Sequence, residues 1–172
     1  MLVYHIVLMK HLRILNSKEI KRILKTLEEQ FGKFDLRDYV FFMNNDSKVF
    51  LLSRKFAELD EKKVRVNNLG LYFGKEEVDG FRLTIEGAQL VNPKKNVVNL
   101  TKDQVPCWMR GEDIEVGDLK LYGYVVVKHE DDIFGCGRFK EGRVLNSIPK
   151  SRRIIGIQSD DKTGLRTVKC GK

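Results

Sequence analysis

The clearest pattern in the chain is an amphipathic helix near its start. Between residues 20 and 31, apolar side chains recur at three- and four-residue spacing, which places them in one stripe on a helix. Asn16 precedes the stripe and fits the N-cap position, and Glu19 can reach back to it as in a capping box. Gly32 follows the stripe and is a typical helix end. The stripe consists of Ile20, Ile23, Leu24, Leu27 and Phe31.

Short runs of β-branched and aromatic residues follow this helix. Residues 39–43 and 48–52 flank Asn44-Asn45-Asp46, which is turn chemistry, so the two runs predict a β-hairpin. The first part of the chain is therefore expected to place one or two helices against a small, mostly antiparallel sheet. Its further predicted elements are a helical turn at 54–59 and strands at 64–66, 69–73 and 81–85.

A domain boundary is expected at residues 92–96. This stretch, Asn-Pro-Lys-Lys-Asn, combines a proline with charge and carries no apolar anchor. A chain of 172 residues is long enough for two small domains. We therefore expect one domain over residues 1–92 and a second over residues 93–172.

The second domain is predicted to consist mainly of short strands. A short helix is expected to be capped by Thr101 and to end at Arg110-Gly111. Many short strands with little helix favour a small β barrel that closes its own edges. The predicted fold class is therefore α+β, with a small α+β domain followed by a β pseudo-barrel. The strands are expected at 122–128, 133–139, 142–146, 154–157 and 165–169.

The charge of the chain is distributed unevenly. The formal net charge is +8, and residues 138–172 hold ten lysines and arginines against three acidic residues. A segment this basic repels itself unless a polyanion covers it, and nucleic acid is the commonest cellular polyanion with a repeating charge. A solvated face that binds nothing is the alternative interpretation. No long amphipathic basic helix occurs there, so membrane binding is not expected.

Six basic residues of this segment are the first candidates for RNA phosphate contacts. Three of them alternate with apolar or small neighbours, so they can share one strand face. Arg110 and Lys120 are second choices. Asn146 could bond to a base or sugar edge, or it could equally shape the turn before Pro149. The six residues are Arg138, Lys140, Arg143, Lys150, Arg152 and Arg153.

Two further features allow two interpretations each. Tyr122 and Tyr124 share a strand face, where they either stack on a base or belong to the core. Gly135 and Gly137 also share a face, where they either let an RNA backbone approach closely or permit the barrel to curve.

The sequence offers little for catalysis. The three histidines are far apart, and the acidic run 130–132 lies in a turn where carboxylates are simply solvated. No phosphate-binding loop or Gly-x-Ser-x-Gly motif is present. A Pro-Cys pair carries the nucleophile of RNA cytosine-5 methyltransferases, but Cys107 stands beside Trp108 in a predicted helix, which favours a buried structural cysteine. No enzyme activity, metal or cofactor is expected.

The cysteines and residues 1–9 indicate the cellular compartment in which the protein is expected. Cys107, Cys136 and Cys170 are widely spaced and odd in number, which argues against a disulfide framework and favours a reducing compartment. The apolar stretch 1–9 is too short to cross a bilayer. A cytoplasmic protein is therefore expected.

The second half of the chain resembles a PUA domain, the small RNA-binding pseudo-barrel. In particular, it is similar to the PUA-like region at the C-terminus of Sun-family RNA cytosine-5 methyltransferases. The most specific match is Gly142 to Arg153, which looks like that family's Gly-Arg-x-x-Asn-x-x-Pro-Lys-x-x-Arg ending. The other matching segments are residues 108–112 (Trp-Met-Arg-Gly-Glu), 123–127 and 134–138.

The first half is similar to the pre-PUA module that precedes PUA in those enzymes and in Nip-type ribosome-biogenesis factors. The matching segments are residues 69–75 and 80–85. The resemblance implies RNA binding but not methyl transfer, because the catalytic domain that precedes this region in those enzymes is absent. We therefore expect a non-catalytic protein that binds ribosomal or transfer RNA in ribosome biogenesis or RNA modification.

The sequence also allows an alternative function. The chain could be a protein-interaction subunit whose first domain docks a separate RNA-modifying enzyme or ribosome-assembly factor. Phe41 and Phe42 are candidate exposed aromatics for such a docking face. A methyltransferase that uses Cys107 is a third and remote alternative.

Overall fold

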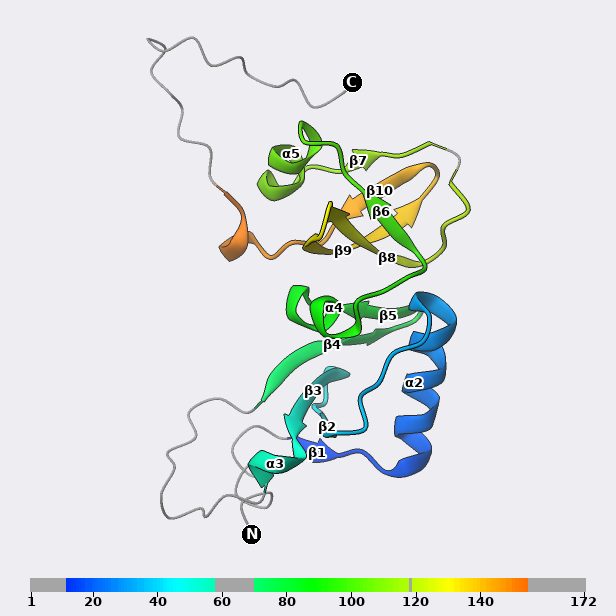
Figure 1. Ribbon diagram of the computed structural model, residues 1–172, viewed down its shortest axis with the longest axis vertical. Coiled ribbons are helices and arrows are strands. Elements are labelled where there is room, and N and C mark those ends of the chain that lie inside the picture. The colour runs from blue at the N-terminus through cyan, green and yellow to red at the C-terminus, as the bar shows by residue number, and fades with distance from the viewer. Residues whose placement is uncertain (1–11, 58–69, 118, 155–172) are drawn as a thin grey trace. The chain divides into compact units, whose positions relative to one another are not determined.

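The computed structural model describes residues 12–57, 70–117 and 119–154 (Figure 1). The chain divides into two compact units, which we call unit 1 (up to Lys95) and unit 2 (from Asn96 onward). Each unit combines helix with a five-stranded sheet among its described residues. The predicted α+β fold class is therefore confirmed, and each unit is described in turn.

The described part of unit 1 is built on one antiparallel sheet whose strands follow sequence order, β1-β2-β3-β4-β5. Helix α2 lies along this sheet (Figure 1). The strands are β1 (Arg13–Ile14), β2 (Tyr39–Met43), β3 (Lys48–Ser53), β4 (Leu71–Glu77) and β5 (Gly80–Leu83), and the helices are α2 (Ser17–Phe31), α3 (Arg54–Ala57) and α4 (Ile85–Val91).

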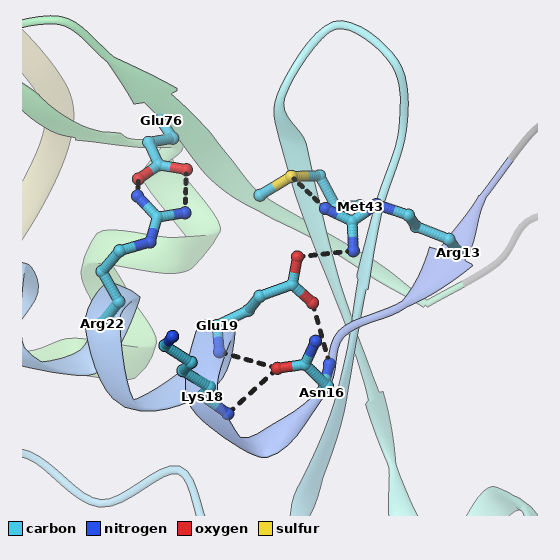
Figure 2. A network of polar contacts seen from close by, with 7 residues as sticks. All are labelled: Arg13, Asn16, Lys18, Glu19, Arg22, Met43 and Glu76. Atoms are coloured by element: carbon cyan, nitrogen blue, oxygen red, sulfur yellow. Dashed lines mark hydrogen bonds and ion pairs between the residues drawn. The ribbon is translucent and has the colours of Figure 1, made fainter.

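The helix predicted from the apolar stripe is confirmed as α2. The Asn16 side-chain oxygen accepts the backbone N–H groups of Lys18 and Glu19, both at 3.0 Å, and the Glu19 carboxylate accepts the Asn16 N–H at 3.0 Å (Figure 2). This capping box satisfies backbone donors that the first helical turn leaves without partners. Gly32 ends the helix with a φ of 91°. The fully buried part of the stripe is Ile23, Leu27 and Phe31.

Two arginines attach α2 to the sheet (Figure 2). Arg22 of α2 makes two hydrogen bonds to the carboxylate of Glu76 on β4. Arg13 of β1 lies 2.7 Å from the Glu19 carboxylate. The pKa of Glu19 is lowered, first by the hydrogen bond from the Asn16 N–H and then by Arg13. These contacts identify the sheet face on which α2 lies.

The remaining predictions for unit 1 hold in part. The hairpin is confirmed as β2 and β3, and the helical turn as α3. The strand predicted at 81–85 ends at Leu83, because the Thr84 hydroxyl accepts the Gly87 N–H at 2.9 Å and caps α4. The strand predicted at 69–73 continues to Glu77. The strand predicted at 64–66 lies outside the described residues.

The described part of unit 2 contains a second five-stranded sheet in the order β6-β8-β9-β10-β7. The β6–β8 pair is parallel and the other pairs are antiparallel. The elements are β6 (Val97–Asn99), α5 (Gln104–Arg110), β7 (Ile114–Glu115), β8 (Tyr124–His129), β9 (Asp132–Lys140), β10 (Arg143–Asn146) and the 3₁₀ turn η2 (Lys150–Arg152).

The core of unit 2 forms around Trp108 of α5. Its side chain is fully buried, and the indole N–H donates to the Phe134 carbonyl at 3.0 Å. Gly137 leaves the room that this ring needs, since a Cβ there would lie 2.7 Å from the Trp108 ring and 2.4 Å from Val144. The buried residues around Trp108 are Val98, Leu100, Cys107, Ile114, Val125, Val127, Val144 and Ile148.

Several details of unit 2 differ from the prediction. Thr101 does not cap the helix, which starts after Asp103. The short strands β6 and β7 are absent from the prediction, because two or three residues carry too little alternation to be recognised. The candidate strand at 165–169 lies outside the described residues, as does all of the candidate at 154–157 except Ile154. None of the described helices has the length and apolar character needed to cross a bilayer.

Candidate nucleic-acid interface

A tight hairpin places three basic residues on one face of unit 2. The turn residues Glu141 and Gly142 have φ angles of 49° and 75°, as in the two-residue turns that match strand twist. In the resulting register Lys140 lies opposite Arg143, and Arg138 lies opposite Leu145. Because alternate residues of a strand share a face, Arg138, Lys140 and Arg143 lie together. We call these three residues the hairpin cations.

The hairpin cations lie on the sheet face opposite Trp108. Their neighbours Phe139 and Val144 point the other way and pack in the Trp108 core. Like charges directly opposite each other destabilise a strand pair. Glu141 is 3.9 Å from Lys140, and Arg143 forms no ion pair with any described residue. Glu115 of β7 lies opposite Arg143, so this exposed face carries the three cations with one carboxylate in register beside them.

One tyrosine lies on the face of the hairpin cations, and a second is exposed just before β8. Tyr124 is paired with Arg138 across the β8–β9 ladder, so it shares their face. Tyr122 is 56% exposed, and Asn96 holds its backbone by accepting its N–H at 3.3 Å and donating to its carbonyl at 2.7 Å. Tyr122 is therefore not part of the core, whereas Tyr124 is partly buried and remains open to both interpretations.

The hairpin cations lie at the end of this face near the β9–β10 turn. Val126 and Cys136 occupy the same face further along the strands, where both are buried. Tyr124 marks the transition, since it is partly buried. The candidate interface is therefore a patch made of the hairpin cations and Tyr124, with the exposed Tyr122 preceding Tyr124 in the chain.

The 3₁₀ turn η2 presents the next basic residues. Lys150, Ser151 and Arg152 are all exposed. The turn begins after Pro149, whose carbonyl accepts the Arg152 N–H at 2.8 Å. A tight turn with exposed lysine and arginine side chains suits contact with phosphates.

Asn146 has a structural role instead. Its side-chain amide donates to the carbonyls of Trp108 (2.8 Å) and Glu112 (3.2 Å), and its side-chain oxygen accepts the Ile148 N–H at 2.8 Å. Its own backbone N–H donates to the Asp113 carboxylate at 2.8 Å. Of the two alternatives for Asn146, the structure therefore supports the shaping of the turn before Pro149, since both amide donors and the oxygen are already engaged.

Arg153 and Arg110 are also engaged within unit 2. The Arg153 Nε donates to the Ile148 carbonyl at 3.1 Å. Its guanidinium lies over Gly111, where a Cβ would be 2.5 Å from Nε and Cζ. The Arg110 Nε donates to the Glu112 carboxylate at 2.9 Å. Arg153 therefore helps to fix the end of α5 against the chain after β10, whereas Arg110 bonds within the end of α5 itself.

Lys120 stands apart from these contacts. It is exposed in the connection between β7 and β8 and forms no ion pair with a described residue. The structure thus gathers Arg138, Lys140 and Arg143 on one face. Of the other predicted residues, it leaves Lys120, Lys150 and Arg152 exposed and uses Arg110, Asn146 and Arg153 in internal contacts.

The candidates for catalysis do not converge. Cys107 is 1% exposed, so it is not an accessible nucleophile. The His129 Nδ1 lies 2.8 Å from the Leu100 carbonyl, a structural contact. Within the described residues, no group of three or more histidine, cysteine or acidic side chains is placed to hold a metal ion.

Comparisons with known proteins agree with the resemblance drawn from the sequence. Residues 95–154 match the model of the family described as the methyltransferase RsmF PUA domain. Two curated relatives are ribosomal RNA small subunit methyltransferase F of Aeromonas salmonicida, 26% identical over 138 residues, and the protein of the same name from Aeromonas hydrophila, 25% identical over 138 residues. Each alignment covers 79% of this chain and 28% of the relative.

These matches confirm the resemblance to the PUA region of RNA methyltransferases. The family model covers β6 to the end of η2, so it includes Trp108, the hairpin cations and the Asn146 contacts. The alignments are longer than unit 2 and therefore extend into unit 1. Since the chain spans only 28% of the length of these relatives, their methyltransferase activity is a property of much longer proteins.

Proposed function

We propose that this chain is a non-catalytic RNA-binding protein that acts on ribosomal or transfer RNA in ribosome biogenesis or RNA modification. The observation that carries the proposal is the patch on unit 2 in which Arg138, Lys140 and Arg143 share a face with Tyr124. The similarity of residues 95–154 to a PUA domain of a ribosomal RNA methyltransferase supports it.

The patch fits RNA by its chemistry. Lysine and arginine contacts to phosphates provide affinity and set the register of the bound strand. Proteins that recognise specific RNAs usually read unpaired bases, which stack on aromatic side chains. In our proposal the hairpin cations, Lys150 and Arg152 hold phosphates, and Tyr122 and Tyr124 contact a base. Arg110, Lys120 and Arg153 are peripheral to this patch.

We propose that the chain supplies RNA recognition while a separate enzyme supplies the chemistry. The buried state of Cys107 supports a role without catalysis. In this proposal no cofactor is needed, the working compartment is the cytoplasm, and the protein partner is an RNA-modifying enzyme or a ribosome-assembly factor.

A docking role for unit 1 is the second candidate function. Phe41 and Phe42 do not serve it as exposed aromatics, since they are 2% and 0% exposed. A groove of about 670 Å³ along α2 favours it instead. Its apolar lining includes Ile20, Leu24 and Phe34.

The proposal is tested by binding to structured ribosomal RNA fragments over a salt series. Replacing Arg143, Lys150 and Arg152 together with alanine is expected to weaken binding and to lower the slope of log affinity against log salt by roughly 0.7 to 0.9 for each phosphate contact that the substitutions remove. A matched control replaces the exposed lysines Lys18, Lys25 and Lys33, which removes the same charge from unit 1.

The control separates local contacts from net charge. We expect the control variant to retain most of its affinity and its salt slope, because its lysines lie outside the patch. Equal reductions in both variants would mean that only the total charge matters. An unchanged slope in the first variant would exclude the patch as a phosphate-binding surface. RNA binding that requires an added protein partner would favour the docking function.

A further inference from the structure

The sheet of unit 1 has a second face, on the side away from α2. Glu76 on β4 is held by Arg22 of α2, and Phe41 on β2 lines a groove with α2 residues, so these two side chains mark the helix side. Because neighbouring residues of a strand point to opposite faces, Phe42 and Glu77 mark the other side. Phe42 belongs to a small separate cluster with Leu12 and Leu52.

A pair of aromatic rings lies on this second face. Phe42 is paired with Phe50 across β2 and β3, and Phe50 is paired with Tyr72 across β3 and β4. The ring centroids of Phe50 and Tyr72 are 5.2 Å apart, and both side chains are partly exposed. Partial burial raises the pKa of the Tyr72 hydroxyl above its ordinary value, at which it is already neutral near pH 7. A neutral, partly exposed aromatic pair offers a surface on which a base can stack.

A β-bulge brings a row of basic residues onto the same face. Phe50 pairs with Tyr72 while Val49 pairs with Gly74, so Phe73 is the extra residue. Such a bulge shifts the alternation by one position, which returns Lys75 to the face of Tyr72.

The basic row then crosses three strands. Lys48 is paired with Lys75 across β3 and β4, and Lys75 is paired with Arg82 across β4 and β5. The effect of the Arg82 and Glu77 charges on the pKa of Tyr72 agrees with this placement. We call Phe50, Tyr72, Lys48, Lys75 and Arg82 the aromatic–basic face.

The charges of this row are only partly compensated. The Glu77 carboxylate lies 3.2 Å from the Lys75 side chain and 3.6 Å from the Arg82 side chain, so one negative charge forms ion pairs with two positive charges. Lys48 lies 3.7 Å from Asp46 in the exposed turn. The three basic side chains keep 42%, 30% and 32% of their surface exposed, in chain order. Like charges in direct register destabilise a sheet, and a bound polyanion would relieve that repulsion.

We propose that the aromatic–basic face of unit 1 is a second RNA contact that takes unpaired nucleotides. A base stacks on Tyr72 and Phe50, and the flanking phosphates lie along Lys48, Lys75 and Arg82. This combination of aromatic side chains with a basic groove is the general chemistry of single-strand binding, and it tolerates different base sequences. The inference rests on the proposed function and adds to it the kind of RNA that unit 1 recognises.

The test uses the full chain and a short oligouridylate that carries 5-iodouridine as a photo-cross-linking base. We expect cross-links to Tyr72 or Phe50, and we expect Tyr72→Leu combined with Phe50→Leu to weaken binding of this oligonucleotide about tenfold. The control is Leu119→Ala, an exposed apolar residue outside the face and outside the groove. Thermal melting of each variant checks that the fold is retained.

A second variant does not disturb the hydrophobic cluster. Replacing Lys75 and Arg82 with glutamine is expected to lower the salt slope for the oligouridylate by roughly 0.7 for each phosphate contact removed. If the protein with Tyr72→Leu and Phe50→Leu does not fold, the salt slope of the variant without Lys75 and Arg82 is sufficient to test the proposal. An unchanged slope would overturn it.

The outcomes distinguish this inference from the proposed function. If the wild-type chain binds RNA but neither variant of the aromatic–basic face changes binding, the inference is wrong and the role of unit 2 stands. If the wild-type chain binds no RNA, both are wrong. If polyglutamate binds the face as tightly as the oligouridylate does, the face serves acidic proteins and the inference is wrong.

Discussion

The β9–β10 hairpin and the turn that follows it are adjacent in sequence, yet their polar side chains serve different purposes. In the hairpin, Lys140 and Arg143 face each other on the outer side of the sheet, where both are exposed. In the turn, Asn146 uses both amide donors and its oxygen in internal hydrogen bonds. One motif, residues 142–153, therefore combines side chains that face outward with side chains that hold the motif in shape.

The two kinds of side chain should give different experimental signatures. A side chain that holds the fold should change the free energy of unfolding when it is replaced and leave the salt slope of RNA binding unaltered. A side chain that contacts phosphate should change the slope and leave unfolding nearly unaltered. Each replacement below is expected to show one signature and not the other.

Asn146→Ala is expected to have the greatest effect. The substitution leaves the Trp108 and Glu112 carbonyls and the Ile148 N–H without their partner, so the free energy of unfolding should fall by about 3 kcal/mol. Chemical denaturation monitored by Trp108 fluorescence measures the change. The exposed Asn99→Ala serves as the control and should have little effect. A folded Asn146→Ala protein with unchanged stability and weaker RNA binding would contradict the structural role.

A smaller reduction is expected for Gly137→Ala. The new Cβ would lie 2.4 Å from Val144 and 2.7 Å from Trp108, and such overpacking costs about 2 kcal/mol in the free energy of unfolding. The same denaturation experiment measures it. Gly117→Ala, whose Cβ would meet nothing within 4 Å, controls for the removal of a glycine, although its φ of 68° adds backbone strain. Equal stabilities of the Gly137 variant and the wild-type chain would show that Trp108 does not need this space.

Arg153→Ala should have the weakest effect of the three. The hydrogen bond to the Ile148 carbonyl is removed, which should lower the free energy of unfolding by about 1 kcal/mol. The salt slope for RNA should stay at the wild-type value, whereas Arg152→Ala in the neighbouring exposed position should reduce it. Filter binding over a salt series compares the two. A lower slope for the Arg153 variant alone would assign Arg153 to the RNA interface.

Much of the fold could be predicted because local signals agree with it. The capping box at Asn16 and Glu19, the apolar stripe of α2 and the turn chemistry of residues 44–46 each act over a few residues, so the sequence alone reveals them. The end of β5 could not be predicted from the sequence, because Thr84 fits both an alternating strand and a helix N-cap. The hydrogen bond that the Thr84 hydroxyl accepts from the Gly87 N–H shows that it is the cap. The two-residue strands β1 and β7 are defined only by their pairing with β2 and β10, which the local sequence does not reveal.

The candidate site could be predicted to a different degree. Alternation places Arg138, Lys140 and Arg143 on one face, and the hairpin register has them there. The sequence pattern could not show that Arg153, unlike these three residues, is used in an internal contact. The Arg153 guanidinium contacts Gly111, which is 42 residues away in sequence. The aromatic–basic face has no sequence signal, since a bulge at Phe73 shifts the alternation that would have linked Tyr72 to Lys75.

Replacing Arg138, Lys140 and Arg143 together with alanine, and measuring both unfolding and RNA binding over a salt series, tests whether the hairpin face binds RNA. We predict that the salt slope falls by about 2 to 3 in total, at roughly 0.7 to 0.9 for each contact. We also predict that the free energy of unfolding stays near the wild-type value, because no described core contact is removed. An unchanged slope in a folded variant would contradict RNA binding by this face of unit 2.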